Sequence, residues 1–140
     1  MKNAELLELF EIAAAVRENA YAPYSKFKVG AALLDDTGVV HAGCNVEVAN
    51  YKGGTCAEGT AIAKMISSGK GPHRIKAIVI VGGGDEPCAP CGDCRQFINE
   101  FADANTRIYA QDPATGMISS TTMKKLLPAA FGPNSLAAKP

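Results

Sequence analysis

One apolar segment, residues 75–81, constrains the fold of this 140-residue chain more than any other feature. Residues 77–81 are Ala, Ile or Val in succession, with no alternation between apolar and polar positions. A strand with one solvated face alternates, so this segment predicts a central strand that is covered on both faces. Helical patterns precede and follow it along the chain. The order, with helices interleaved among strands, predicts the α/β class, with a mixed sheet between helical layers.

The other expected elements follow from periodicity and turn residues. Apolar positions that step by three and four predict a first helix, capped by Asn3 and ending near Ala22-Pro23. Residues 29–34 and 39–42 predict a hairpin around a turn at 35–38. We further expect helices at 56–67 and 91–101, the second with Phe97, Ile98 and Phe101 inward, strands at 107–110 and 117–119, and a short helix capped by Thr121 or Thr122.

Composition narrows the function. An apolar share of 47% predicts a single domain, 1–140, with a core at about 3–133 and a C-terminal tail at 134–140. Fourteen basic residues balance 14 acidic ones, which argues against a nucleic-acid or anionic-membrane surface and favours a small substrate. Early acidic residues and short apolar runs argue against a signal peptide or a membrane span, so we expect a cytoplasmic protein.

The cysteines predict a metal centre. Their number, five, is odd, and three lie between positions 88 and 94, which favours reduced thiols that bind metal over a disulfide framework. Cys56, Cys91 and Cys94 would give zinc three thiolates and leave its fourth tetrahedral position open, as in catalytic sites. Glu58, two residues from Cys56, could then move protons to and from water. This combination predicts metal-assisted hydrolysis.

The expected helix starts support this interpretation, and two alternatives remain open. A helix N-terminus carries a partial positive charge, which lowers the pKa of a thiol and favours the thiolate. A fourth sulfur from Cys88 could instead close a structural zinc site, although Cys88 precedes Pro90 and is expected to point away from the helix face. Glu58 could also be an ordinary first-turn acid that complements the helix dipole. His41 and His73 have no ligand spacing to any cysteine and are interpreted as strand and loop residues.

Several separated motifs span roughly residues 6–133. They are Ala22-Pro23-Tyr24-Ser25, Phe27-Lys28-Val29-Gly30-Ala31-Ala32, Gly43-Cys44-Asn45-Val46-Glu47, Cys56-Ala57-Glu58, Pro90-Cys91-Gly92-Asp93-Cys94-Arg95-Gln96, and Leu126-Leu127-Pro128 with Phe131. Together they resemble the small homotetrameric zinc-dependent cytidine deaminases. The resemblance implies a three-layer α/β/α sandwich with a mixed five-stranded sheet, one Zn²⁺ per subunit, a nucleoside substrate and a homotetramer.

The same resemblance implies an activity and a role for each site residue. The activity is hydrolysis of cytidine and deoxycytidine to uridine and deoxyuridine with release of ammonia, in pyrimidine salvage. Glu58 would carry protons from water to the pyrimidine and to the departing amine. The implied zinc ligands are Cys56, Cys91 and Cys94; Asn45, Val46 and Glu47 would hold the ribose, Phe27 would pack on the base, the Ala57 amide would meet the pyrimidine carbonyl, and Tyr51 and Phe131 would reach a neighbouring subunit's pocket.

Two departures from the family pattern leave the substrate open. Gly59 stands where these enzymes usually carry an arginine that offsets the thiolate charge. Arg95 or the helix dipoles could compensate; alternatively, the pocket is altered and accepts an N4-substituted cytidine. In that case Gly59→Arg would change the relative activity on cytidine and N4-substituted cytidines. Gly53-Gly54 resembles the matching stretch of blasticidin-type deaminases. A non-catalytic zinc-stabilised scaffold is the alternative from another class.

Overall fold

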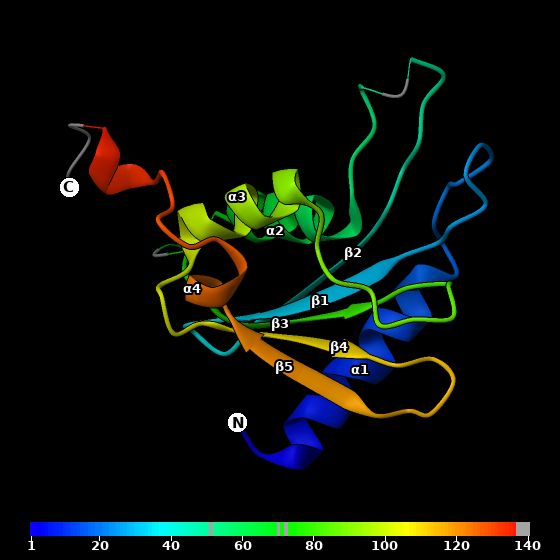
Figure 1. Ribbon diagram of the computed structural model, residues 1–140, viewed down its shortest axis with the longest axis horizontal. Helices are drawn as coiled ribbons and strands as arrows, with labels where there is room; N and C mark the ends of the chain where they lie inside the picture. The colour runs from blue at the N-terminus through cyan, green and yellow to red at the C-terminus, as the bar shows by residue number, and fades with distance from the viewer. Residues whose placement is uncertain (51, 70, 72, 137–140) are drawn as a thin grey trace.

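A five-stranded mixed sheet forms the centre of the fold (Figure 1). The computed structural model describes residues 1–50, 52–69, 71 and 73–136. The strand order is β2-β1-β3-β4-β5. The elements are α1 (Asn3–Arg17), β1 (Gly30–Asp35), β2 (Val40–Cys44), α2 (Ala57–Ser67), β3 (Ile75–Val81), α3 (Gly92–Phe101), β4 (Arg107–Gln111), β5 (Ile118–Thr122), α4 (Met123–Leu126) and a 3₁₀ turn, Pro133–Ser135.

The apolar segment β3 is the central strand, as predicted. It pairs antiparallel with β1 and parallel with β4, and the two outer pairs, β1–β2 and β4–β5, are antiparallel. All of its residues except Lys76 are buried, which is why its sequence shows no alternation. The mixed sheet and its central strand therefore agree with the sequence prediction.

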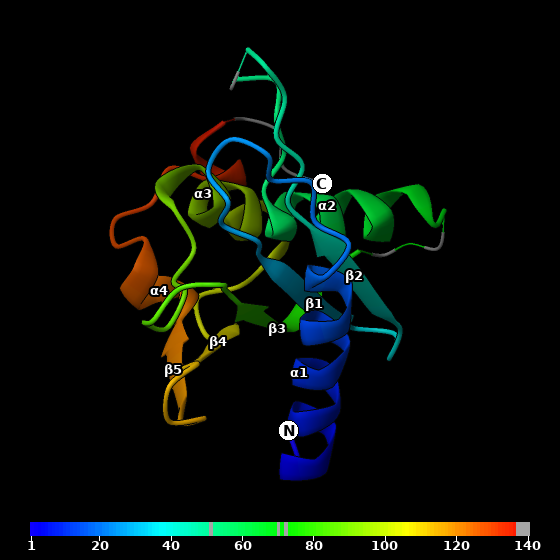
Figure 2. The same cartoon turned by 90° about the vertical axis from the view of Figure 1, so that its right-hand side faces the viewer.

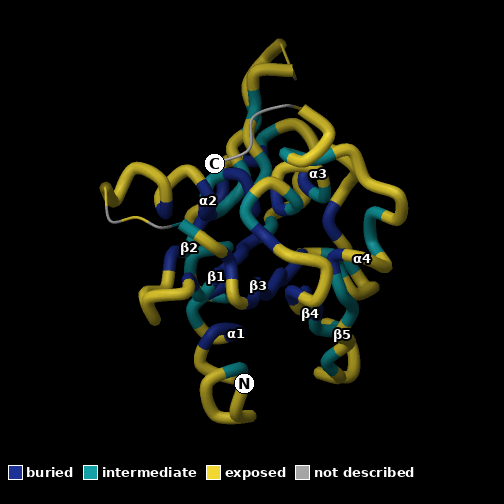
Figure 3. The backbone as a smooth tube through the Cα atoms, turned by 90° about the vertical axis from the view of Figure 1, so that its left-hand side faces the viewer, coloured by how far each residue is buried: buried dark blue, intermediate teal, exposed yellow. Residues whose placement is uncertain are grey.

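Helices cover both faces of the sheet. Helix α1 packs against β1, β2 and β3 on one face, and α2 packs against β1 and β2 on the other, with α3 beside α2 (Figures 1 and 2). One core cluster joins α1 to the sheet through Leu9, Phe10 and Val79. The other joins α2 and α3 to the opposite face through Ile62, Ile78 and other buried side chains. This arrangement is the three-layer α/β/α sandwich expected from the resemblance, and its buried backbone runs through the strands (Figure 3).

Three details differ from the sequence predictions. Helix α1 begins at Asn3 after Lys2, which makes no side-chain cap, and it ends at Arg17, five residues before Ala22. Helix α3 does place Ile98 in the core, but Phe97 is 43% exposed rather than inward. The last strand runs to Thr122, whose hydroxyl then accepts from the Lys125 amide and caps α4. This cap agrees with one of the two predicted alternatives.

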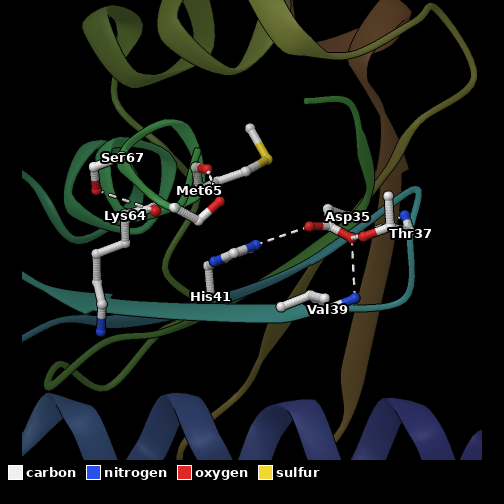
Figure 4. Close-up of polar contacts among 8 residues, drawn as sticks. Asp35, Thr37, Val39, His41, Lys64, Met65 and Ser67 are labelled. Carbon is white, nitrogen blue, oxygen red and sulfur yellow. Dashed lines mark hydrogen bonds and ion pairs between the residues drawn. The ribbon is translucent and has the colours of Figure 1, made fainter. Parts of the chain in front are cut away.

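A buried polar cluster closes the β1–β2 hairpin. The carboxylate of Asp35 accepts from the amides of Thr37 and Val39, from the Thr37 hydroxyl and, on its second oxygen, contacts the imidazole of His41 (Figure 4). His41 lies on β2, as predicted, and is buried. The turn predicted at residues 35–38 is therefore present, and the hydrogen bonds of Asp35 join it to both strands of the hairpin.

Within the described residues, no helix is both long enough and apolar enough to cross a membrane. Helices α2 and α3 both begin at the same end of the sheet (Figure 2). The loop before β1 and the segments on either side of residue 51 project from that end. The predicted site residues come from these segments and helix starts. The fold thus gathers at one end of the molecule residues that the sequence spreads from position 27 to position 97.

Candidate active site

The starts of α2 and α3 open onto one cavity. Cys56 and Cys91 have extended backbone angles and occupy the N-cap positions of the two helices, neither with a side-chain cap hydrogen bond. Both cysteines line a cavity of about 890 Å³, a volume within the usual range for small-molecule sites. Two helix N-termini at one cavity place partial positive charge where thiolates are expected. The motif at residues 56–58 and the motif at residues 90–96 therefore meet at one cavity, as the sequence predicted.

Cys56, Glu58 and Cys94 form a candidate metal centre. One ligand atom from each, two sulfurs and a carboxylate oxygen, lie within 4.8 Å of one another. Glu58 and Cys94 are buried and Cys56 is half-buried. Thiolates and carboxylates are ligands that Zn²⁺ accepts, so this donor set fits zinc.

The redox state of these sulfurs differs from the sequence prediction. Cys56 and Cys94 are joined as a disulfide, whereas the sequence predicted reduced thiols. Their Cα atoms lie 7.2 Å apart, beyond the range of about 4.4–6.8 Å that disulfides usually span. The two backbones are therefore spaced more suitably for two ligands around an ion than for a direct bond, and ligation requires the reduced thiolates.

The other two cysteines of the second motif line the same cavity. Cys91 is a free, exposed thiol and does not belong to the close group of Cys56, Glu58 and Cys94. Cys88 was expected to point away, yet it lines the cavity and packs at the edge of the core. Burial, and then the negative charges of Glu58 and Cys91, raise the pKa of the Cys88 thiol to about 11.

Glu58 is the buried acid of the site. Only 4% of the residue is exposed, and burial raises its pKa above the usual value for a glutamic acid. A carboxyl group in such surroundings holds a proton more readily near neutral pH than an exposed glutamate does. Glu58 is thus suited to accepting and donating protons beside the sulfurs.

Asn45 connects the site to the segment that carries Phe27. Its side-chain amide donates to the carbonyl oxygen of Phe27 at 2.8 Å, and its side-chain oxygen accepts from the Val29 amide at 2.8 Å. An asparagine side chain has two N–H donors and an oxygen with two lone pairs. One donor and one lone pair therefore remain for a ligand, while Asn45 also fixes the backbone of 27–29.

Glu47 also uses part of its hydrogen-bonding capacity within the protein and keeps part for a ligand. One carboxylate oxygen accepts from the amides of Tyr24 and Ser25, both at 3.1 Å, and the other accepts from the Ser25 hydroxyl. The hydrogen bond from the Ser25 side chain, followed by that from its amide, lowers the pKa of Glu47. Glu47 therefore stays ionised, with acceptor capacity left on its second oxygen for a hydroxyl group.

The remaining predicted residues differ in position. Ala57 is fully buried at the start of α2, and Val46 lines the cavity and pairs through its backbone with Thr55. Phe131 is 58% exposed and is not among the residues that line the cavity of this chain. Tyr51 lies outside the described residues. The structure therefore brings Phe27, Asn45, Val46, Glu47 and Ala57 to the cavity and leaves Phe131 outside it.

Phe97 is a cavity residue that sequence reasoning assigned to the core. It lines the wall beside Gly59, and a Cβ atom built on Gly59 would lie 3.7 Å from the Phe97 ring and 3.4 Å from the sulfur of Cys56. Its spacing could have indicated this position, because Phe97 is three residues from Cys94 on one helix face. Arg95 does not replace the missing arginine at the sulfurs, since its guanidinium donates to the carbonyls of Pro90 and Leu126.

Comparisons with known proteins agree with this geometry. The sequence model of the family described as "Cytidine and deoxycytidylate deaminase zinc-binding region" matches residues 3–110. A cytidine deaminase of Sporosarcina psychrophila is 45% identical over 121 residues, which cover 86% of this chain and 87% of the relative. The 1.6 Å crystal structure of the cytidine deaminase from Burkholderia pseudomallei superposes with a TM-score of 0.84 at 43% identity, covering 94% of this chain and 100% of that one. The corresponding Mycobacterium tuberculosis structure gives 0.79 at 36% identity, covering 91% and 98%.

The fold and the site together define a zinc-dependent hydrolytic deaminase. Within that class, the chain belongs to the cytidine and deoxycytidylate deaminase family, because the family model covers residues 3–110 and the relatives match over most of their length. Zinc is the cofactor, and Cys56, Glu58 and Cys94 are positioned to bind a metal ion.

Proposed function

We propose that this enzyme hydrolyses the 4-amino group of cytidine and deoxycytidine, giving uridine or deoxyuridine and ammonia. One observation carries the proposal: the buried carboxyl of Glu58 lies with the sulfurs of Cys56 and Cys94 at a cavity large enough for a nucleoside. The similarity to cytidine deaminases supports the choice of substrate.

Glu58 is the proposed proton carrier. Zinc, when bound, supplies Lewis-acid chemistry that makes water acidic near neutral pH. Glu58 accepts a proton from the attacking water and delivers it to ring nitrogen N3. It then takes the proton of the new C4 hydroxyl and passes it to the departing amine, so that the C4 carbonyl forms as ammonia leaves. The net reaction consumes one water and releases one ammonia. Cys91 is proposed as the third sulfur ligand, since it occupies the N-cap position of α3 and lines the same cavity.

The opposite part of the cavity is proposed to hold the nucleoside. Phe27 offers its ring to the base, and Asn45 and Glu47 direct their remaining hydrogen-bonding groups to the ribose hydroxyls. An amide and a carboxylate suit an uncharged sugar, whereas a phosphate would call for Arg or Lys. The Ala57 amide at the start of α2 is proposed to meet the pyrimidine carbonyl, with Val46 packing beside the sugar.

Assembly and cellular role are proposed from the family. A homotetramer would bring Tyr51 and Phe131 of one subunit to a neighbour's cavity. The 58% exposure of Phe131 and its absence from this chain's own cavity support such a role. A role in cytoplasmic pyrimidine salvage is consistent with a cavity that holds an unphosphorylated nucleoside.

The test is a comparison of Glu58→Gln with the unaltered enzyme. Loss of cytosine absorbance on adding enzyme to cytidine reports turnover, and metal analysis reports zinc per chain. We expect Glu58→Gln to keep its zinc and fold while its turnover falls by at least about 10²-fold. Glu11→Gln, which alters an exposed residue of α1, is the matched control. Full turnover by Glu58→Gln would contradict the proposal, and zinc loss would instead make Glu58 a ligand.

A further inference from the structure

Three consecutive glycines follow the central strand, and the reaction as described so far does not use them. Gly82, Gly83 and Gly84 connect β3 to the segment that carries Cys88. Among the described glycines, the left-handed backbone region is occupied at positions 38, 69 and 116, and not at these three. Their backbone angles are therefore open to other residues, and the reason for glycine must lie in what a side chain would meet.

Two of the glycines lie directly against the ring of Phe27. A Cβ atom built on Gly84 would lie 2.9 Å from the Phe27 ring atom Cε2. One built on Gly82 would lie 3.3 Å from Cζ of the same ring and 2.7 Å from Cβ of Cys88. Carbon atoms do not approach so closely without displacement, since their optimal separation is about 3.5–4.0 Å. The ring thus occupies the space that side chains at 82 and 84 would need.

The backbones on both sides of this contact are held in place. The guanidinium of Arg17 donates to the carbonyl oxygen of Gly82 at 2.8 Å, which ties the glycine segment to the end of α1. The amide of Phe27 donates to the Ser25 hydroxyl at 3.0 Å, and the carbonyl of Phe27 accepts from Asn45. Because the backbone is anchored at Gly82 and at Phe27, we expect a new side chain at position 84 to displace the Phe27 ring, whose far end it would meet.

We propose that Gly82 and Gly84 are positioning residues that seat the Phe27 ring at the depth in the cavity where the pyrimidine base packs on it. This inference rests on the proposed function, in which Phe27 contacts the base. The Phe27 residue is 40% exposed and lines the cavity, while Gly82 and Gly84 lie against its ring atoms Cζ and Cε2. A methyl group at position 84 would push the ring into the space of the base, and binding would weaken while the proton-transferring group stayed in place.

The test measures KM and kcat for cytidine in Gly84→Ala, Phe27→Leu and the double variant. Gly84→Ala is expected to raise KM about tenfold and to change kcat less than about twofold, because stacking against the ring contributes to binding. Gly71→Ala is the matched control, since its Cβ would meet only His73 at 3.7 Å or more. Zinc content and melting temperature are measured for every variant.

The double variant shows whether the effect passes through the ring. A leucine at position 27 removes the atoms that clash, so adding Gly84→Ala to Phe27→Leu is expected to leave KM unchanged within about twofold. If Gly84→Ala alone fails to fold, a folded double variant with the KM of Phe27→Leu still supports the proposal that Gly84 positions the Phe27 ring. Additive KM effects, an unfolded double variant, or an unchanged KM in Gly84→Ala would overturn it. Absence of cytidine turnover in the unaltered enzyme would instead refute the proposed function.

Discussion

The imidazole nitrogen Nε2 of His41 lies 2.8 Å from the carboxylate oxygen Oδ2 of Asp35, and both side chains are buried. Burial works to raise the pKa of Asp35, but hydrogen bonds from Thr37, His41 and the Val39 amide outweigh it and hold the pKa below its usual value. The ionised carboxylate therefore holds the turn of the β1–β2 hairpin at the edge of the sheet.

Replacing Asp35 by Asn should destabilise the fold in a pH-dependent way. At pH 7 we expect the free energy of unfolding to fall by about 2 kcal/mol, because hydrogen bonds to a charged acceptor are replaced by weaker ones to a neutral amide oxygen. The folded-state pKa of Asp35 lies below that of the unfolded chain, about 3.9. Its stabilisation is thus present above that pH and is lost as pH falls toward the folded-state pKa. Urea unfolding between pH 3 and 7 would show the difference between the two proteins narrowing below about pH 4.

Asp36→Asn provides the control for this prediction. Asp36 is the exposed neighbour of Asp35, so its substitution should change the free energy of unfolding by less than about 0.5 kcal/mol throughout the range from pH 3 to 7. A constant difference between Asp35→Asn and the unaltered protein across the pH range would show that the carboxylate's charge does not contribute.

Gly59 should tolerate alanine but not arginine. A Cβ atom at this position would meet Cys56, Thr55 and Phe97 at 3.4–3.7 Å, which is ordinary contact. Because alanine favours helix over glycine, Gly59→Ala should gain about 0.5 kcal/mol of stability with zinc content unchanged. The longer side chain of Gly59→Arg must displace the Phe97 ring or enter the cavity, so KM for cytidine should rise. Thermal unfolding, metal analysis and kinetics check these outcomes.

Adding Phe97→Ala to Gly59→Arg tests whether the ring is the obstacle. The double variant should recover a large part of the lost affinity for cytidine, since the arginine can then lie over the helix beside the sulfurs. If Gly59→Arg alone binds cytidine as well as the unaltered enzyme does, the ring and the cavity leave more room than these contacts indicate. Including an N4-substituted cytidine shows whether position 59 selects between the two substrates.

The sequence predicted the elements better than the orientation of individual side chains. The strand Ile75–Val81 was predicted with its bounds because a two-sided apolar segment has few alternatives in an α/β fold. Phe97 was misplaced because Phe97 and Ile98 are both apolar and adjacent on α3, and only Ile98 faces the core. Periodicity does not reveal that the neighbouring helix face borders a cavity.

The hydrogen bonds around the site were beyond sequence reasoning for a different reason. Asn45 bonds to the backbone of Phe27 and Val29, and Glu47 bonds to Ser25, across loops with no repeating pattern. Such contacts depend on how the chain returns from β2 to the segment before β1. The position of Cys88 in the cavity also depends on its packing against Gly82, and the spacing of residues in the sequence does not predict this contact.

Arg95 should stabilise the second cysteine motif by tying it to α4. Its Nε donates to the carbonyl of Pro90 at 2.8 Å and its Nη1 donates to that of Leu126 at 3.1 Å. A lysine has a compact charge and does not reproduce this fork, so Arg95→Lys should lose about 1 kcal/mol of stability. Zinc should also dissociate faster, because Pro90 directly precedes Cys91. Release to a chromogenic chelator measures the rate.

Arg107→Lys is the matched control, since Arg107 bonds to Ser120 on the exposed side of β4. Its zinc release should equal that of the unaltered enzyme. Equal release rates in Arg95→Lys and Arg107→Lys would mean that the link from Pro90 to Leu126 does not constrain the metal site.

Removal of zinc should expose the two closest sulfurs to oxidation. Thiolates of Cys56 and Cys94 cannot both ligate an ion and share a disulfide, so the two states exclude each other. After chelation in air, dissolved oxygen should take two electrons and two protons from the pair. Denaturing alkylation and mass spectrometry should then find three modified cysteines, Cys44, Cys88 and Cys91, against five in zinc-loaded protein. Reductant with Zn²⁺ should restore turnover, whereas five modified cysteines after prolonged exposure of the zinc-free protein would refute the pairing.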